Sequence, residues 1–141
     1  MKRDFDSNGH AVFSLHYHLV VVVKYRRKAL YSNEILKRLK EIAEYVGKSH
    51  FLEIKEMNGE SDHVHFLLQT KPHTDICKYI NAMKSATSRL LKREFPLMLK
   101  YIYGESLWSP SYFICTVGGA PLEVLKRYIE QQDKPGVHRK C

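Results

Sequence analysis

Two histidines separated by one residue, His63 and His65, have the types and spacing that most directly suggest chemistry in this chain. Side chains alternate between the two faces of a β-strand, so in an extended segment these imidazoles share one face. Val64, Phe66 and Leu68 then share the other, wholly apolar face. With Cα atoms roughly 6.8 Å apart, the two imidazoles can converge on one divalent metal ion. Because His-x-His is a short and common pattern, the spacing alone favours two exposed histidines on a solvated sheet surface.

A second pair, His16 and His18, has the same spacing within the segment LHYHLVVVVKY. This segment is rich in β-branched and aromatic residues, which favour strands, so these imidazoles also share one face. They fit a metal site, sheet-surface residues or DNA contacts beside a core strand. The local sequence does not rank the two pairs.

A tyrosine near the end of the chain, Tyr128, is followed one helical turn later by Gln132. A tyrosine hydroxyl can attack phosphorus when a phosphate is positioned and a metal ion polarises it. A glutamine oxygen is a neutral donor that suits Mg²⁺ or Mn²⁺. The alternative is structural, because Leu122, Leu125 and Ile129 form an apolar stripe at helical spacing that Tyr128 could simply border.

The chain is basic, with 23 Lys and Arg against 15 Asp and Glu, a formal net charge of +8 and a pI near 9.4. This balance favours a polyanionic partner, and nucleic acid fits better than a membrane surface. Basic residues near aromatic ones could bind phosphates while the rings stack on unpaired bases. For the basic residues of the second helix, the alternative is that they only keep a helix face solvated. The candidate DNA-binding residues are Lys24, Arg26, Arg27, Lys28, Lys78, Arg89 and Lys92.

The elements that must position these residues follow the order β-α-β-β-α-β-α. Strands are expected at about 12–25, 51–57, 63–69 and 110–117, and helices at about 33–47, 74–95 and 121–133. The stretch 97–109 is less regular. This order is the split βαβ pattern of an α+β, ferredoxin-like fold, shared with RNA-recognition domains, plus one C-terminal helix. It predicts an antiparallel sheet with two helices on one face and the other face uncovered.

The 141 residues fit one domain, 1–141, without internal repeats or a linker. The longest apolar run, Leu19 to Val23, is far too short to span a bilayer, and the first residues contain no apolar stretch of signal-peptide length. We therefore expect a cytoplasmic protein. No GxxxxGK[ST] phosphate loop is present, so no nucleotide cofactor is expected.

Four segments together resemble a known family: KYRRKAL at 24–30, DHVHFLL at 62–68, LWSPSYF at 107–113 and YIEQQ at 128–132. In type and order they resemble the single-tyrosine HUH transposases of the insertion sequence 200/605 family, from about Leu15 to Gln132. The resemblance implies a metal-dependent enzyme that cuts and rejoins single-stranded DNA at hairpin-marked ends of a mobile element. It also implies a homodimer whose active sites are completed by the partner's tyrosine helix.

Carried over by motif, His63 and His65 would be ligands of Mg²⁺ or Mn²⁺ and Gln132 the third ligand. Tyr128 would be the nucleophile, forming a 5′-phosphotyrosine and releasing a 3′-hydroxyl. The resemblance gives no catalytic role to His18. Ser61 stands where family members often have proline, which affects a turn and not a ligand.

The glycines Gly118 and Gly119 are expected to form a hinge before the last helix, because glycine absorbs large backbone changes. Two other functions remain open. The chain could be a domesticated HUH nuclease that acts on repeated palindromes. It could also be a non-catalytic domain that binds single-stranded nucleic acid, which explains the fold and charge but not the tyrosine helix.

Overall fold

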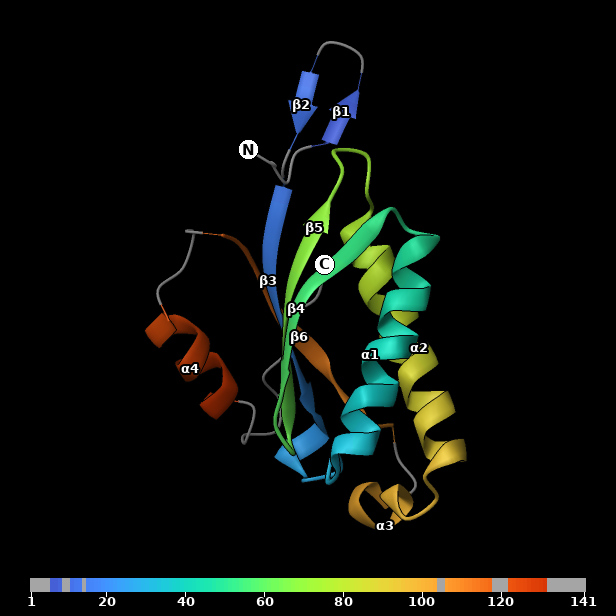
Figure 1. Ribbon diagram of the computed structural model, residues 1–141. Helices are drawn as coiled ribbons and strands as arrows, with labels where there is room; N and C mark the ends of the chain where they lie inside the picture. Colours follow the sequence, from blue (N-terminus) through green and yellow to red (C-terminus); the bar gives the residue numbers. More distant parts are fainter. Residues whose placement is uncertain (1–5, 9–10, 14, 104–105, 118–121, 132–141) are drawn as a thin grey trace.

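The computed structural model describes residues 6–8, 11–13, 15–103, 106–117 and 122–131. From the third strand onward the order is β-α-β-β-α-β followed by a helix, with one short extra helix before the last strand, which confirms the α+β, ferredoxin-like class. The elements are β1 (Asp6–Asn8), β2 (Ala11–Phe13), β3 (Leu15–Val23), the 3₁₀ turn η1 (Lys24–Arg26), α1 (Asn33–Lys48), β4 (Leu52–Gly59), β5 (His63–Thr70), α2 (Ile76–Glu94), α3 (Met98–Ile102), β6 (Trp108–Thr116) and α4 (Leu122–Gln131) (Figure 1).

The central sheet is antiparallel and has four strands in the order β4-β5-β3-β6. The two strands that carry the histidine pairs, β3 and β5, are therefore neighbours. In their register Val20 lies opposite His65 and Val22 lies opposite His63. This register brings two histidine segments that are distant in sequence side by side.

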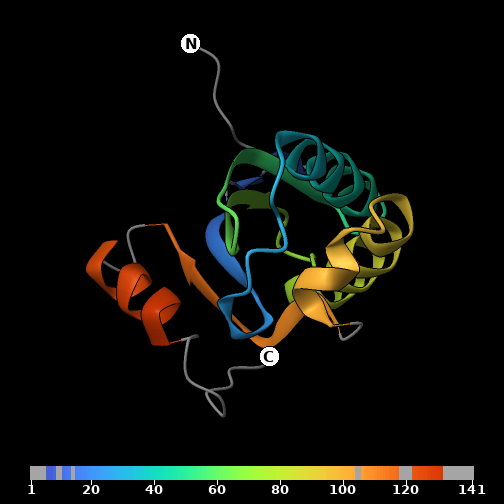
Figure 2. The ribbon, with the colours of Figure 1, turned by 90° about the horizontal axis from the view of Figure 1, so that it is seen from below.

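One face of the sheet packs against α1 and α2, which lie side by side on it (Figures 1 and 2). Alternate residues of β3 and β5 form the buried layer, as the two-residue period of a strand requires. Side chains cap the first turns of both helices, where backbone N–H groups lack helical partners. The Ser32 hydroxyl accepts from the Ile35 amide (3.2 Å), and the Asp75 carboxylate accepts from the Lys78 amide (3.1 Å).

The opposite face of the sheet is partly covered by α4, which lies across it from α1 and α2 (Figure 2). A second, small buried cluster forms there from Val20, Val22 and Tyr128, with Phe113 and Ile129 packed against it. The expectation of an uncovered face is therefore wrong in part. The apolar surfaces of Tyr128 and Ile129 gain more from covering these valines than from contact with water.

Some elements differ from the sequence-based expectation. The first strand is shorter than 12–25, because β3 ends where Tyr25 and Arg26 adopt left-handed φ angles of 57° and 52°. The residues before β3 contribute instead to the hairpin β1–β2. A short helix, α3, lies within the stretch expected to be irregular. Gly118 and Gly119 lie outside the described residues. No helix in the described part of the chain is long and apolar enough to cross a membrane.

Candidate active site

His63 and His65 lie on the same face of β5, because burial along this strand alternates strictly. Both side chains are half-buried, whereas Val64, Phe66 and Leu68 are fully buried against the helices. The two imidazoles therefore point to the side of the sheet on which α4 lies. This is the arrangement that the spacing predicts for two residues meeting one ligand.

The imidazole of His63 is held by the preceding residue, Asp62. Its Nδ1 lies 2.8 Å from Oδ1 of Asp62. An ionised carboxylate only accepts hydrogen bonds, so Nδ1–H is the donor, and in the neutral imidazole Nε2 then carries the lone pair. Asp62 is only 4% exposed, and its Oδ2 also accepts from Nε (3.1 Å) and Nη2 (3.0 Å) of Arg26, with Lys28 Nζ at 3.7 Å.

These contacts determine the charge of the Asp62 carboxyl group. Burial by itself raises the pKa of Asp62, but the hydrogen bond from His63 and the ion pair with Arg26 outweigh burial and lower the pKa below its ordinary value. Asp62 is therefore an ionised acceptor at neutral pH. Residues of this kind orient metal-binding histidines in many proteins.

The second imidazole, His65, is in contact with His18 of the neighbouring strand. Nδ1 of His18 lies 2.9 Å from Nε2 of His65, and the rings stack with centroids 5.0 Å apart. Burial lowers the pKa of His65, the nearby His18 lowers it further, and the partial opposition of Glu56 does not reverse the shift. His65 thus favours the neutral form, which is the form that binds metal ions.

His18 is therefore a member of the site that sequence reasoning left without a role. The signal that could have found it is the pairing of the two histidine segments as adjacent antiparallel strands. In that register His18 lies opposite Leu67, two residues from His65 on the same face. His16 lies further along β3, opposite Gln69.

Tyr128 lies on α4 and is 4% exposed. Its ring packs against Val20 and Val22 and lies 5.4 Å, centroid to centroid, from the ring of Phe113. Its hydroxyl donates to the Ser111 hydroxyl on β6, at 3.2 Å. The ring of Tyr128 is thus part of the apolar surface of the helix, as the structural interpretation expected. Its hydroxyl forms a hydrogen bond with Ser111.

The tyrosine and the two histidines lie on the same side of the sheet but over different strands. The ring of Tyr128 rests on the two valines of β3 that pair with His63 and His65. Its hydroxyl, however, is bonded on β6, which lies beyond β3 as seen from β5. Gln132 lies outside the described residues. Of the expected catalytic set, the structure therefore brings three members to one face.

No group of three or more His, Cys, Asp or Glu side chains suited to a metal ion occurs within the described ranges. The expected metal donors on this face are the nitrogens of His63 and His65, and the His18 imidazole lies against that of His65. A third protein ligand would have to come from another residue type or from residues outside these ranges.

The basic segment 24–28 divides between two sets of contacts. Arg26 and Lys28 turn towards Asp62. The guanidinium of Arg27 instead lies over the rings of Tyr25 (5.2 Å) and Tyr103 (4.6 Å), within hydrogen-bonding distance of the Ile102 carbonyl (3.3 Å). Tyr103 is 76% exposed, so an aromatic face is open to solvent beside this arginine.

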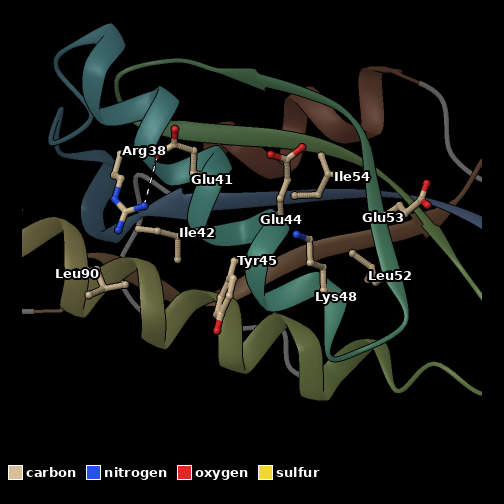
Figure 3. Close-up of a pocket in the computed structure, with 10 residues that line it drawn as sticks. All are labelled: Arg38, Glu41, Ile42, Glu44, Tyr45, Lys48, Leu52, Glu53, Ile54 and Leu90. Carbon is tan, nitrogen blue, oxygen red and sulfur yellow. Dashed lines mark hydrogen bonds and ion pairs between the residues drawn. The ribbon is translucent and has the colours of Figure 1, made fainter.

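The remaining basic candidates lie on α2. Lys78 is exposed near the start of this helix, whereas Arg89 and Lys92 line a groove between α2 and the start of β6. A different hollow of about 910 Å³ lies between α1, α2 and β4 (Figure 3). Three carboxylates, of Glu41, Glu44 and Glu53, line that hollow together with the cations of Arg38 and Lys48. Its charge is therefore mixed, which favours a polyanion less than an all-basic surface does.

Comparisons with known proteins agree on one family. A family model described as IS200-like transposase matches residues 11–132. The ISDra2 transposase TnpA of Deinococcus radiodurans is 36% identical over 121 residues, covering 86% of each protein. The transposase for insertion sequence element IS200 of Salmonella typhimurium is 29% identical over 140 residues, covering 94% of this chain and 88% of that protein.

Solved structures give the same picture. A crystal structure of a transposase candidate from Deinococcus radiodurans superposes with a TM-score of 0.80 at 31% identity, over 90% of this chain and 97% of that chain. The structure of a REP-associated tyrosine transposase bound to a REP hairpin superposes with a TM-score of 0.55 at 12% identity, over 89% of this chain and 68% of that chain. The second likeness concerns the fold alone.

Proposed function

This chain belongs to the family of IS200-like transposases, and we propose that it cleaves and rejoins single-stranded DNA at the hairpin-marked ends of an insertion sequence. The observation that carries this proposal is the face of the sheet on which His63, buttressed by Asp62, and His65 lie beside the helix of Tyr128. Its substrate DNA would place the protein in the cytoplasm. The whole chain, 1–141, would act as a single HUH transposase domain.

We assign the metal site to His63 and His65, with Gln132 as the third ligand. The fit rests on the donors themselves. Both imidazoles point to one face, and each has one ring nitrogen engaged by a neighbour, Asp62 or His18, which leaves the other nitrogen for an ion. Gln132 would add to the two imidazoles an amide oxygen, the type of donor that suits Mn²⁺ or Mg²⁺. A divalent ion bound there supplies Lewis-acid polarisation of a phosphodiester.

Tyr128 is the proposed nucleophile. Its phenolic oxygen forms a bond to phosphorus as the bond from phosphorus to the 3′ oxygen breaks, and the phenolic proton leaves as the 3′ oxygen becomes a hydroxyl. The product is a 5′-phosphotyrosine and a free 3′-hydroxyl. Attack by another 3′-hydroxyl reverses these bond changes on a new strand, so rejoining needs no nucleotide cofactor.

The position of the Tyr128 hydroxyl supports a homodimer with shared active sites. Within one chain this hydroxyl is bonded to Ser111 on β6, whereas the histidines lie on β5 with β3 between them. The tyrosine helix of a second chain could place its hydroxyl at the histidines, because it is not bound to β6 of the same chain. A hinge at Gly118 and Gly119 would allow the helix to move as a unit.

The proposed strand contacts are the basic and aromatic residues at the end of the sheet near His63. Arg27 with the exposed rings of Tyr25 and Tyr103 offers a charged and stackable surface for unpaired bases. Lys24 lies over the ring of Tyr25 at 5.7 Å and adds a further positive charge. Arg26 and Lys28 primarily form ion pairs with Asp62. They would contribute to DNA binding only through their positive charge.

Covalent trapping tests this proposal. Labelled single strands from the DNA flanking the gene are mixed with the protein and Mn²⁺ or Mg²⁺, then run on a denaturing gel. We expect a protein–DNA band that disappears with Tyr128→Phe, with EDTA and with duplex substrate. Tyr45→Phe, which changes an exposed tyrosine of α1, is the matched control and should retain the band.

The two alternative functions give different results in the same experiment. A non-catalytic domain would bind hairpin strands and form no covalent band under any condition. A domesticated nuclease acting on repeated palindromes would form the band, but with scattered genomic palindromes and not with the strands flanking its own gene.

A further inference from the structure

We propose that Arg26 is a positioning residue of the histidine site: its guanidinium fixes the Asp62 carboxylate, which in turn orients the imidazole of His63. This inference rests on the proposed function, because it concerns His63 as a proposed metal ligand. It goes beyond that function, since it gives a basic residue of the segment 24–28 a role inside the protein. In this role Arg26 contacts neither the metal ion nor the DNA strand.

The Asp62 carboxylate lies between partners from two different elements. Its Oδ1 lies 2.8 Å from Nδ1 of His63 on β5. Its Oδ2 accepts hydrogen bonds from Nε (3.1 Å) and Nη2 (3.0 Å) of Arg26 in η1. Two donors of one rigid, planar guanidinium converge on this oxygen and hold it more firmly than a single flexible donor would. Because the carboxylate is planar, holding Oδ2 also determines where Oδ1 points.

Burial makes this arrangement depend on Arg26. The side chain of Asp62 is only 6% exposed. A buried carboxylate that loses a charged partner is costly to keep in place. Lys28, which also pairs with Asp62, lies at 3.7 Å and its side chain is 69% exposed, so it is a poor substitute for the two donors of Arg26. Without Arg26, the carboxylate would turn towards Lys28 or water and release His63.

The backbone after β3 is arranged so that Arg26 reaches this carboxylate. Arg26 and the residue before it adopt left-handed φ angles of 52° and 57°, which L-residues avoid unless surrounding contacts support them. On one side of this turn the Val23 amide donates to the Asp62 carbonyl at 2.9 Å. On the other side the Leu30 amide donates to the Ser61 carbonyl, also at 2.9 Å. The strained turn is thus attached at both ends to the residues that precede His63.

The neighbouring arginine, Arg27, differs from Arg26 in its surroundings. Its guanidinium lies over the rings of Tyr25 (5.2 Å) and Tyr103 (4.6 Å), and Tyr103 is largely exposed. A strand phosphate can approach that surface without breaking an ion pair to Asp62. At Arg26 the same phosphate would compete with Asp62 for Nε and Nη2. The two consecutive arginines therefore receive different roles, Arg26 in the site and Arg27 at the strand.

The test compares Arg26→Met and Arg26→Lys with a matched control, Arg38→Met. Arg38 also binds one carboxylate through Nε and Nη2, that of Glu94 at 2.8 and 3.1 Å. It lies on α1, however, on the opposite side of the sheet from α4 (Figure 2). Thermal melting checks that each variant folds. Arg26→Lys keeps the positive charge, so it decides the question if Arg26→Met does not fold.

Three properties of each variant are measured. Isothermal titration calorimetry with Mn²⁺ alone gives the metal affinity. ¹H–¹⁵N correlation spectra of the metal-free protein, at a pH well above about 6.5 where histidine is neutral, show which ring nitrogen of His63 carries the proton. Fluorescence anisotropy with a labelled single strand of the flanking DNA gives the slope of log K against log salt.

We expect Arg26→Met to bind Mn²⁺ about tenfold more weakly, because Asp62 no longer orients His63. Arg26→Lys lacks the planar fork of donors and should lose about threefold. In both metal-free Arg26 variants the proton of His63 should be divided between Nδ1 and Nε2, whereas the unmodified protein and Arg38→Met should hold it on Nδ1. The salt slope of the Arg26 variants should fall by much less than the roughly 0.9 of a lost phosphate contact, which Arg27→Met should show.

Two results would overturn the proposal. One is a Mn²⁺ affinity of the Arg26 variants equal to that of Arg38→Met, and the other is a proton that stays on Nδ1 of His63. A salt slope lowered by about 0.9 with both of these properties unchanged would identify Arg26 as a phosphate contact. The spectra need no bound ion, so they decide the role of Arg26 even if the unmodified protein binds no Mn²⁺. That failure would count against the proposed metal site alone.

Discussion

The Nδ1 atom of His63 lies 2.8 Å from Oδ1 of Asp62, and the other oxygen of the same carboxylate lies 3.0 Å from Arg26. The imidazole is thereby connected to the basic segment that follows β3. One buried carboxylate both orients the imidazole of a proposed metal ligand and holds the turn in place. A residue adjacent to the histidine pair thus contributes to the site without lying on its open face.

Replacing Asp62 by asparagine should weaken metal binding by about 10- to 100-fold, because the buttress of His63 loses its charge. Isothermal titration calorimetry with Mn²⁺ measures the change directly. Glu60→Gln removes one negative charge from an exposed neighbour and should leave the affinity unchanged. An Asp62→Asn protein with the affinity of the unmodified chain would show that Asp62 serves only the turn.

His18→Ala should weaken Mn²⁺ binding by about tenfold, because His65 loses the ring that engages its Nε2. His65→Ala should abolish binding altogether. His16→Ala is the matched control, since it removes an imidazole from the same strand further from His65. Complete loss of binding with His18→Ala would instead identify His18 as a ligand.

Ser111→Ala should speed covalent-complex formation by up to about fivefold, because a hydrogen bond worth about 1 kcal/mol no longer holds the Tyr128 hydroxyl on β6. The same change should lower the melting temperature slightly. Single-turnover cleavage of a labelled hairpin strand measures the rate. A slower reaction would show that Ser111 assists Tyr128 in the reactive arrangement.

The ion pair between Arg38 and Glu94 should make a small, pH-dependent contribution to stability. The hydrogen bond from Arg38 is the main cause of the lowered pKa of Glu94, and burial opposes it only in part. A carboxyl whose pKa is lowered by folding stabilises the protein above its unfolded pKa, about 4.3, and loses this effect as the pH falls through the folded value. The effect is modest because the pair is exposed.

The corresponding measurement is chemical denaturation of the unmodified protein and Glu94→Gln at several pH values. The two midpoints should differ at pH 7 and converge at about pH 3. The midpoint of Glu60→Gln should match that of the unmodified protein at every pH. A difference that persists in acid would assign the effect to packing between α1 and α2.

Much of the fold could be predicted because local patterns and tertiary packing agree. The alternation of Val64, Phe66 and Leu68 with the histidines assigned both faces of β5, and apolar residues at helical spacing predicted α1 and α2 close to their observed bounds. The hairpin β1–β2 and the five-residue helix α3 were missed. Such short elements carry too few residues for a periodic pattern.

The site was less predictable than the fold. The contacts of His18 with His65 and of Arg26 with Asp62 join residues 47 and 36 positions apart. They depend on strand register and on the left-handed turn at Tyr25, which no local pattern specifies. The interpretation of the segment 24–28 as a uniform DNA-binding run missed this division of contacts. The roles of Tyr128 and Gln132 remain predictions.

The small cluster beneath α4 has a consequence for how the molecule opens. Among the described side chains only Val20, Val22 and Tyr128 are buried in it, whereas the other face of the sheet seals a much larger core. Detaching α4 therefore exposes far less apolar surface than unfolding the sheet. Amide protons of α4 should exchange with deuterium through frequent local opening, while those of β3 should exchange only when the whole domain unfolds. Releasing the helix that bears the tyrosine would thus cost less free energy than unfolding the sheet.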